Sequence, residues 1–158
     1  MKRICWYLQG TKNNGLLFNP SKKLVVDCYA GADFLGMWVY EDPQDPICAG
    51  SITGFVVTFV KCPLLWVSKL QTDIALSTLH SEYVALSHSV IELLPLKSLI
   101  KEVIDNLGID SEKLKFVSSS TIYEDNNGSI FVETSPGMTP TSNHTAIRYH
   151  LFRQHIGK

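Results

Sequence analysis

The sequence has almost no net charge and no long apolar segment. Its 14 lysines and arginines nearly balance 15 acidic residues, which gives −1 at pH 7 with neutral histidine. There is therefore no global attraction to nucleic acid, and such a partner would have to be held by a local patch. No stretch approaches eighteen uninterrupted apolar residues, so we expect no membrane span. The apolar run after Met1 is too short to predict a signal peptide.

Cysteine is scarce, and its spacing does not suggest a metal site. The four residues Cys5, Cys28, Cys48 and Cys62 form no CxxC pair and have no nearby histidine pattern. This disfavours a zinc site and predicts buried free thiols. The 158 residues are 45% hydrophobic and 18% charged, which is typical of one globular domain with a sizeable core.

The pattern of apolar and turn-forming residues predicts a mixed sheet with helices packed against it. An antiparallel meander comes first, and helices alternate with a short strand afterwards. A proline at position 95 predicts a kink in the long central helix, or a second helix that starts there. The expected strands are 16–18, 24–30, 53–60, 64–68 and 121–124, with a turn at Cys62-Pro63, and the expected helices are 3–8, 77–106, 127–133 and 144–156.

An apolar stripe marks the central helix, and one acid lies at the edge of that stripe. Glu82 is the only acid between Asp73 and Glu92. A carboxylate in this place can project from a rigid element into a cleft, or it can be an ordinary solvated helical side chain. The three tryptophans are predicted to be packing residues rather than base-stacking platforms. The stripe consists of Leu79, Tyr83, Leu86, Val90, Leu93 and Leu94, and the tryptophans are Trp6, Trp38 and Trp66.

Several motifs, in order along the chain, resemble the ribonuclease H domain of copia-type LTR-retrotransposon polyproteins, with part of the connection to reverse transcriptase. Each motif is weak alone, but together they cover almost the whole chain. The matching segments are Tyr7–Lys12 with Gly15–Phe18, Asp27–Phe34, Ser51–Phe55 with Trp66–Gln71 and Ala75–Leu86, and Glu124–Ile130 with His144–Arg153. The resemblance implies an α/β, ribonuclease H-like fold, in which a three-strand antiparallel meander and a parallel strand form a mixed sheet that helices flank. It also implies that the domain is truncated at its C-terminus. Residues 1–20 would be a remnant of the connection and 21–158 the ribonuclease H-like domain.

The resemblance also implies a reaction, which is hydrolysis of the RNA strand of RNA–DNA hybrids with two Mg²⁺ ions. Such displacement needs two hard cations about 3.5–4 Å apart, held by carboxylates from rigid elements. Carried over by motif, Glu82 and Asp125 match two of the ligands. For Asp125 an alternative stays open, because an acid at a strand-to-helix turn is often a helix N-cap.

The chain departs from the family pattern at Gly31, where the first catalytic aspartate would stand. Asp33 and Asp27 share the parity of this position. They lie two and four residues along the strand from Gly31, about 6.6 and 13 Å, so Asp33 could serve as a metal ligand only if the chain bends after Ala30. The fourth acidic position is also unfilled, since the chain reads His144-Thr145-Ala146 there. We therefore expect an impaired site in which magnesium binding is doubtful.

Basic and polar residues near the C-terminus could grip a phosphate backbone, or could form a solvated basic face. The residues that we expect to contact nucleic acid are Lys69, Asn126, Asn127, His144, Arg148, His150 and Arg153. The expected partners are an RNA–DNA hybrid and the reverse transcriptase domain of the same polyprotein, in the cytoplasm within a virus-like particle, or in the nucleus.

Three functions remain open from the sequence. The first is a ribonuclease H domain, weakened or inactive in this copy. The second is a non-catalytic module of the same fold, which binds hybrid or scaffolds the polymerase. The third is a decayed element with no selected role. Gly31 favours the second and third functions, whereas Glu82 and Asp125 together favour descent from a ribonuclease H domain, the first function.

Overall fold

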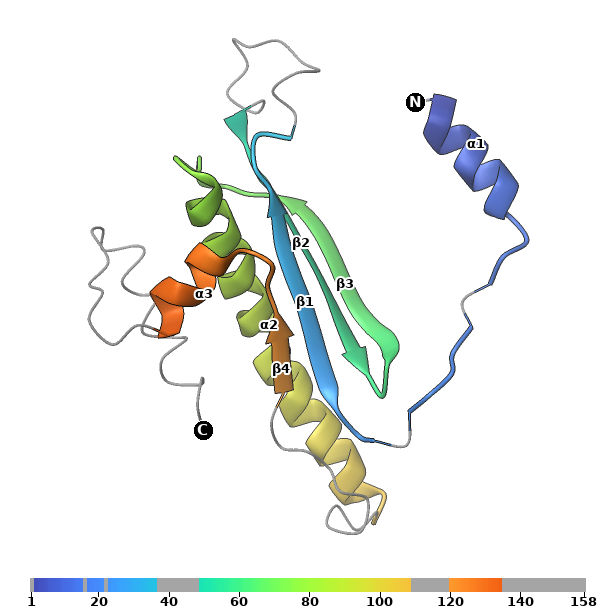
Figure 1. Cartoon of the computed structure of the whole chain (residues 1–158). Coiled ribbons are helices and arrows are strands. Elements are labelled where there is room, and N and C mark those ends of the chain that lie inside the picture. Colours follow the sequence, from blue (N-terminus) through green and yellow to red (C-terminus); the bar gives the residue numbers. More distant parts are fainter. Residues whose placement is uncertain (1, 16, 22, 37–48, 109–119, 135–158) are drawn as a thin grey trace.

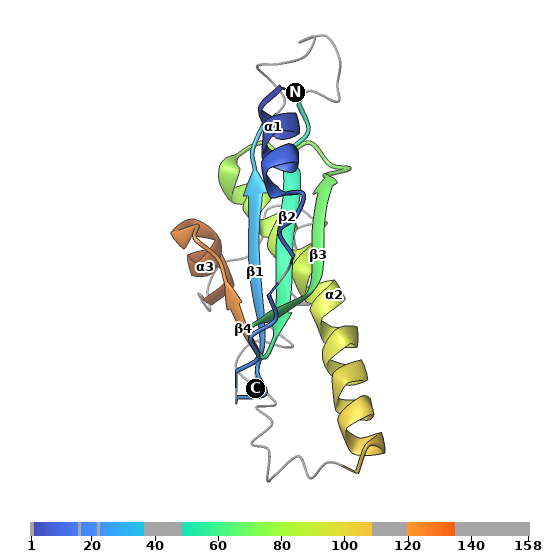
Figure 2. The ribbon, with the colours of Figure 1, turned by 90° about the vertical axis from the view of Figure 1, so that its right-hand side faces the viewer.

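The computed structural model describes residues 2–15, 17–21, 23–36, 49–108 and 120–134. Its centre is a four-stranded sheet in the order β3-β2-β1-β4, with the long helix α2 along one face (Figures 1 and 2). The elements are α1 (Lys2–Thr11), β1 (Val26–Asp33), β2 (Ile52–Phe59), β3 (Cys62–Leu70), α2 (Thr78–Asn106), β4 (Ser120–Tyr123) and α3 (Asn127–Thr134).

The sheet is mixed, as the sequence predicts. β1, β2 and β3 form an antiparallel meander, and β4 pairs parallel to β1 from Val26↔Ser120 to Tyr29↔Tyr123. A parallel pair requires a crossover connection, and the chain makes it through α2. The α/β class is confirmed, and this mixed sheet with helices is consistent with a ribonuclease H-like fold.

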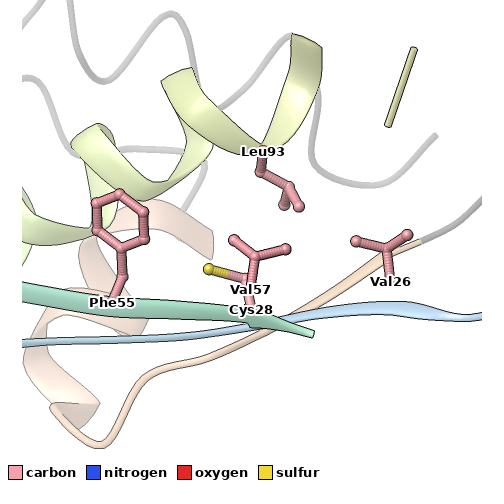
Figure 3. Packing of buried hydrophobic residues seen from close by; sticks show 5 residues of the cluster. All are labelled: Val26, Cys28, Phe55, Val57 and Leu93. Carbon is pink, nitrogen blue, oxygen red and sulfur yellow. The ribbon is translucent and has the colours of Figure 1, made fainter. Parts of the chain in front are cut away.

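The core lies between α2 and the inner face of the sheet. Alternate residues of β1 and β2 point toward the helix because side chains of a strand alternate between its two faces. Figure 3 shows the central cluster, in which Leu93 of α2 packs over Val26, Cys28, Phe55 and Val57. Burial raises the pKa of the Cys28 thiol to about 11, so this cysteine is an inert packing residue. Cys5, by contrast, is exposed, so the expectation of buried thiols fails there.

Helix α2 runs as one element through Pro95, so a helix that starts anew at this proline is not what forms. Proline has no N–H, so Pro95 cannot donate to the carbonyl of Ile91, four residues earlier in the helix. Both residues lie on the exposed side of α2. Water can therefore satisfy that carbonyl, and the helix continues. By length and composition alone α2 could also cross a membrane. The predicted apolar stripe is instead packed on the sheet, with Tyr83, Leu86 and Val90 buried.

The β2–β3 hairpin turns at Val60-Lys61, so the predicted turn at Cys62-Pro63 is wrong by two residues. Both turn residues have positive φ, 50° and 68°, as a two-residue turn that follows the twist of the strands requires. Positive φ is costly for a β-branched residue such as Val60. No glycine or asparagine marks this turn in the sequence, which is why its position was missed.

Replacing Val60-Lys61 with Asn-Gly is expected to raise the free energy of unfolding by about 1 kcal/mol, because these residues tolerate positive φ. Urea denaturation at neutral pH measures the change. Lys61→Gly alone should give only part of the gain. A pair of substitutions that lowers stability would show that the valine conformation is not strained.

Other expectations fail where a segment has no partner. No strand forms at residues 17–18, and Leu17 and Phe18 are exposed. β1 already has β2 and β4 on its two edges, so no ladder remains beside it. Trp6 and Trp66 are 70% and 63% exposed, which contradicts their assignment as packing residues. Trp38 and the helix expected at 144–156 lie outside the described residues.

The outer face of the sheet carries one apolar row. Trp66, Val56, Tyr29 and Tyr123 lie opposite one another across all four strands, and each is at least 37% exposed. The rings of Tyr29 and Tyr123 are stacked with centroids 4.7 Å apart. This parallel strand pair is therefore reinforced by a cross-strand aromatic contact.

Candidate metal centre

Three elements bring acidic side chains to one edge of the sheet. β1 and β4 are parallel, so their carboxyl ends lie side by side. The first turns of α2 pass the same edge, with Ser77 as N-cap accepting a hydrogen bond from the His80 N–H at 3.1 Å. Glu82 lies in the second turn of this helix, and Glu124 and Asp125 follow β4 directly.

The carboxylates of Glu82, Glu124 and Asp125 form a compact cluster. One ligand atom from each lies within 4.8 Å of the others. Two of these residues, Glu82 and Asp125, are the carboxylates singled out from the sequence, and the structure brings them together. Such a concentration of negative charge is unfavourable without a cation, so it is unusual as a purely structural device.

Glu82 is held rigidly by the backbone of β1. Its Oε2 accepts a hydrogen bond from the Ala32 N–H at 2.6 Å. β4 pairs with β1 only as far as Tyr29, so Ala32 lies beyond the parallel ladder. Burial raises the pKa of Glu82, and the nearby charge of Asp125 adds to the rise, while the Ala32 N–H opposes it. The helical acid is thus fixed in place rather than freely solvated.

Glu124 is the residue that sequence reasoning missed. Burial raises its pKa to about 7, and the charges of Glu82 and Asp125 contribute further. Its Oε1 accepts from the Asn126 N–H at 3.2 Å, whereas Oε2 is buried and accepts no hydrogen bond from the part of the chain that the structure describes. The available signal was an acid directly before Asp125 at the end of a predicted strand. The sequence pattern predicts it only as the last residue of that strand.

Asp125 is exposed and does not cap the following helix. Asn126 takes that role, since its Oδ1 accepts from the N–H groups of Gly128 and Ser129 at 2.9 and 3.1 Å. The capping explanation considered for Asp125 therefore does not apply. Gly128 lies against Leu79 of α2, where an added Cβ would come within 2.9 Å of a methyl carbon. This close approach holds the start of α3 beside the cluster.

Gly31 faces the cluster and leaves space there. Among the described residues, a Cβ at this position would meet only Glu82 Oε2, at 3.9 Å. Around it lies an open depression of about 380 Å³, whose lining includes Gly54, Glu82 and Asp125. Asp33 lines the depression as well, but its carboxylate lies against Gly36 and does not join the three clustered acids. The bend that would bring Asp33 to the position of Gly31 is absent, because β1 continues to Asp33.

The other predicted contact residues are only partly placed. Lys69 is exposed on the edge strand β3, paired with Thr53, and is not part of the depression. Asn127 is exposed at the first residue of α3. Four more lie outside the described residues: His144, Arg148, His150 and Arg153.

The donor set suits a hard divalent cation. All three clustered groups offer carboxylate oxygens, which Mg²⁺ and Mn²⁺ prefer over nitrogen and sulfur ligands. The buried Glu124 Oε2 has no hydrogen-bond donor among the described residues, so a cation would satisfy it. Gly31 lines the same depression and contributes no anionic ligand to it.

Fold and site together define an α/β domain that is consistent with a ribonuclease H-like fold and carries an acidic, candidate metal centre. The chain is similar to retrovirus-related Pol polyproteins from three plant transposons. It is 30% and 28% identical over 156 residues to those of RE1 and RE2 from Arabidopsis thaliana, and 29% identical to that of TNT 1-94 from Nicotiana tabacum. Each match covers 99% of this chain and 10% of the relative. No family model and no solved structure matches. The chain therefore spans about a tenth of the length of these transposon polyproteins.

Proposed function

We propose that this chain is the ribonuclease H region of a copia-type retrotransposon polyprotein, which hydrolyses the RNA strand of RNA–DNA hybrids, and that Gly31 impairs this copy. The observation that carries the proposal is the convergence of three carboxylates at the carboxyl ends of β1 and β4. The similarity to Pol polyproteins over 99% of the chain supports it.

Each residue of the cluster has a distinct task in this function. Glu82 and Asp125 would hold Mg²⁺ from the helix side and the strand side of the depression, and Glu124 would contribute its uncommitted Oε2. Bound magnesium would supply an activated water and neutralise charge at the phosphodiester. The Ala32 N–H keeps the Glu82 carboxylate oriented, so the ligand needs little rearrangement when the cation binds.

Gly31 supports a second candidate, a non-catalytic module of the same fold that binds nucleic acid or scaffolds a neighbouring domain. Gly31 lies within reach of the cluster, yet it provides no ligand. Without that anion the cation would be held less tightly, while the shape of the domain would be unchanged. Hybrid binding without cleavage is the behaviour that this candidate predicts.

Cleavage of an end-labelled RNA–DNA hybrid in Mg²⁺ or Mn²⁺ tests the proposal. We expect slow, metal-dependent cleavage that Glu82→Gln reduces by at least about tenfold. Glu92→Gln, an exposed acid farther along α2, is the matched control and should leave the rate unchanged. Hybrid binding with no cleavage at any metal concentration would favour the non-catalytic module. Cleavage that persists in Glu82→Gln would contradict the site.

The proposed setting of this region is a longer polyprotein. They are polyproteins, so other domains of the same polyprotein, including a reverse transcriptase, would be partners of this region. Its place would be the cytoplasm, within a virus-like particle, or the nucleus.

A further inference from the structure

A buried glutamine connects the helix that carries Glu82 to the strands of the sheet. Gln71 follows β3 directly and is 5% exposed. Its Nε2 donates to Thr53 Oγ1 at 3.0 Å and to the Ser81 carbonyl at 2.9 Å. Its backbone N–H donates to the Ser51 carbonyl at 2.8 Å. One residue therefore contacts both the start of β2 and the first turn of α2.

The orientation of the Gln71 amide is fixed by chemistry. A backbone carbonyl only accepts hydrogen bonds, so the Ser81 oxygen must face the NH₂ group and not Oε1. Both Nε2 protons are then used, since the second goes to Thr53. A side chain at position 71 without an NH₂ group would therefore lose both hydrogen bonds, the one to Thr53 and the one to the Ser81 carbonyl.

These contacts form a closed ring of residues that includes Glu82 and lies on one side of the acidic cluster. Ser81 directly precedes Glu82, the Glu82 carboxylate accepts from Ala32, and Ala32 pairs with Thr53 across β1 and β2. Thr53 accepts from Gln71, which returns to Ser81. The ring therefore fixes the backbone of α2 at Ser81 relative to the Ala32–Thr53 pair, and Ala32 of this pair also holds the Glu82 carboxylate.

We propose that Gln71 is a positioning residue, which holds the first turns of α2 so that Glu82 reaches both the Ala32 N–H and the acidic cluster. The role of Glu82 as a metal ligand rests on the proposed function, whereas the positioning of Glu82 by Gln71 does not depend on it. Metal ligands are sensitive to small displacements, and loss of a supporting hydrogen bond typically weakens metal binding about 10- to 100-fold. Tyr83 and Leu86 also pack near Glu82, but such apolar contacts are non-directional, whereas the Gln71 hydrogen bond fixes one particular backbone atom, the Ser81 carbonyl oxygen.

Hydrogen exchange of the Ala32 amide tests this inference without any metal. The Ala32 N–H is bonded to Glu82, so its protection reports whether Glu82 is in place. In Gln71→Met, which keeps the length of the side chain and removes both donors, we expect Ala32 to exchange at least about tenfold faster than in the unchanged chain. In Mn²⁺ titrations the same variant should bind about tenfold more weakly.

A matched control separates positioning from general destabilisation. Ile104→Ala removes buried apolar contacts near the other end of α2, 22 residues from Glu82, and lowers global stability there. At equal free energy of unfolding, it should leave Ala32 exchange and Mn²⁺ affinity near those of the unchanged chain. Equal effects of Gln71→Met and Ile104→Ala on Ala32 would overturn the inference.

A milder variant covers the case in which Gln71→Met does not fold. Thr53→Val keeps the shape of a buried side chain and removes one of the two acceptors of Gln71. We expect Ala32 to exchange about threefold faster, because the Ser81 contact remains, and an unchanged rate would count against the ring. If no variant and not even the unchanged chain binds Mn²⁺, the proposed function fails, while the Ala32 result still decides the role of Gln71.

Discussion

Gly31→Asp is expected to raise the affinity for Mn²⁺ or Mg²⁺ by at least about tenfold, or 1.4 kcal/mol, and to increase hybrid cleavage. The strand leaves room for the new side chain, because a Cβ at this position meets, of the residues that the structure describes, only Glu82, with Oε2 at 3.9 Å. Gly31 does not have positive φ, so an aspartate can adopt its backbone conformation. A fourth carboxylate would then face the three that already cluster. Isothermal titration with Mn²⁺ and a cleavage assay measure the two gains.

Gly31→Asn is the matched control, since it has the same shape without the charge. It should raise the affinity much less than Gly31→Asp does. The metal-free Gly31→Asp chain should also be less stable than the unchanged chain at neutral pH, because a further negative charge enters the cluster. Equal metal affinity of the two variants would show that position 31 does not face the cation.

Glu124→Gln is expected to stabilise the metal-free protein at pH 8 and to have almost no effect at pH 4. Folding raises the pKa of Glu124 from 4.5 to about 7. Between pH 4.5 and pH 7, the folded protein therefore keeps the Glu124 proton while the unfolded chain has lost it. The carboxylate therefore costs no stability below about pH 4.5, and its cost grows as the pH rises to about 7. With solvent screening of this half-exposed group included, the gain at pH 8 should be on the order of 1–2 kcal/mol.

Urea denaturation at the two pH values measures this difference. Glutamine keeps an oxygen that can accept from the Asn126 N–H, so the variant removes the charge and not the hydrogen bond. Glu92→Gln removes a charge from an exposed position of α2 and should show no comparable dependence on pH. A stabilisation of Glu124→Gln that is equally large at pH 4 would mean that charge is not the cause.

The strands and the helical acid were predictable because each has a local signal. Glu82 lies at the edge of an apolar stripe, and the stripe residues Tyr83 and Leu86 beside it are buried as the 3.6-residue period requires. The pairing of β4 beside β1 is a tertiary fact that no local pattern contains. That pairing turns Glu124, seemingly the last residue of a strand, into a member of the cluster. The assignment of the cap to Asn126 rather than Asp125 likewise depends on how the chain leaves the strand.

The misplaced elements have physical causes of a different kind. At Pro95 the sequence rule is correct about the lost hydrogen bond, but exposure of that side of α2 makes the loss inexpensive. At the β2–β3 hairpin, the register Phe59↔Cys62 leaves only Val60 and Lys61 for the turn. The demands of pairing override the preference of valine for extended backbone.

The short extent of β4 has a consequence for how such a centre can arise or be redesigned. Ala32 N–H points away from β2, toward the edge that β4 borders only up to Tyr29. A fourth strand prolonged by two or three residues would compete with the Glu82 carboxylate for that single donor, and would carry Glu124 and Asp125 past the edge. Early termination of the strand is thus a requirement for the acidic pocket, and any attempt to lengthen the sheet here for greater stability would be expected to dismantle it.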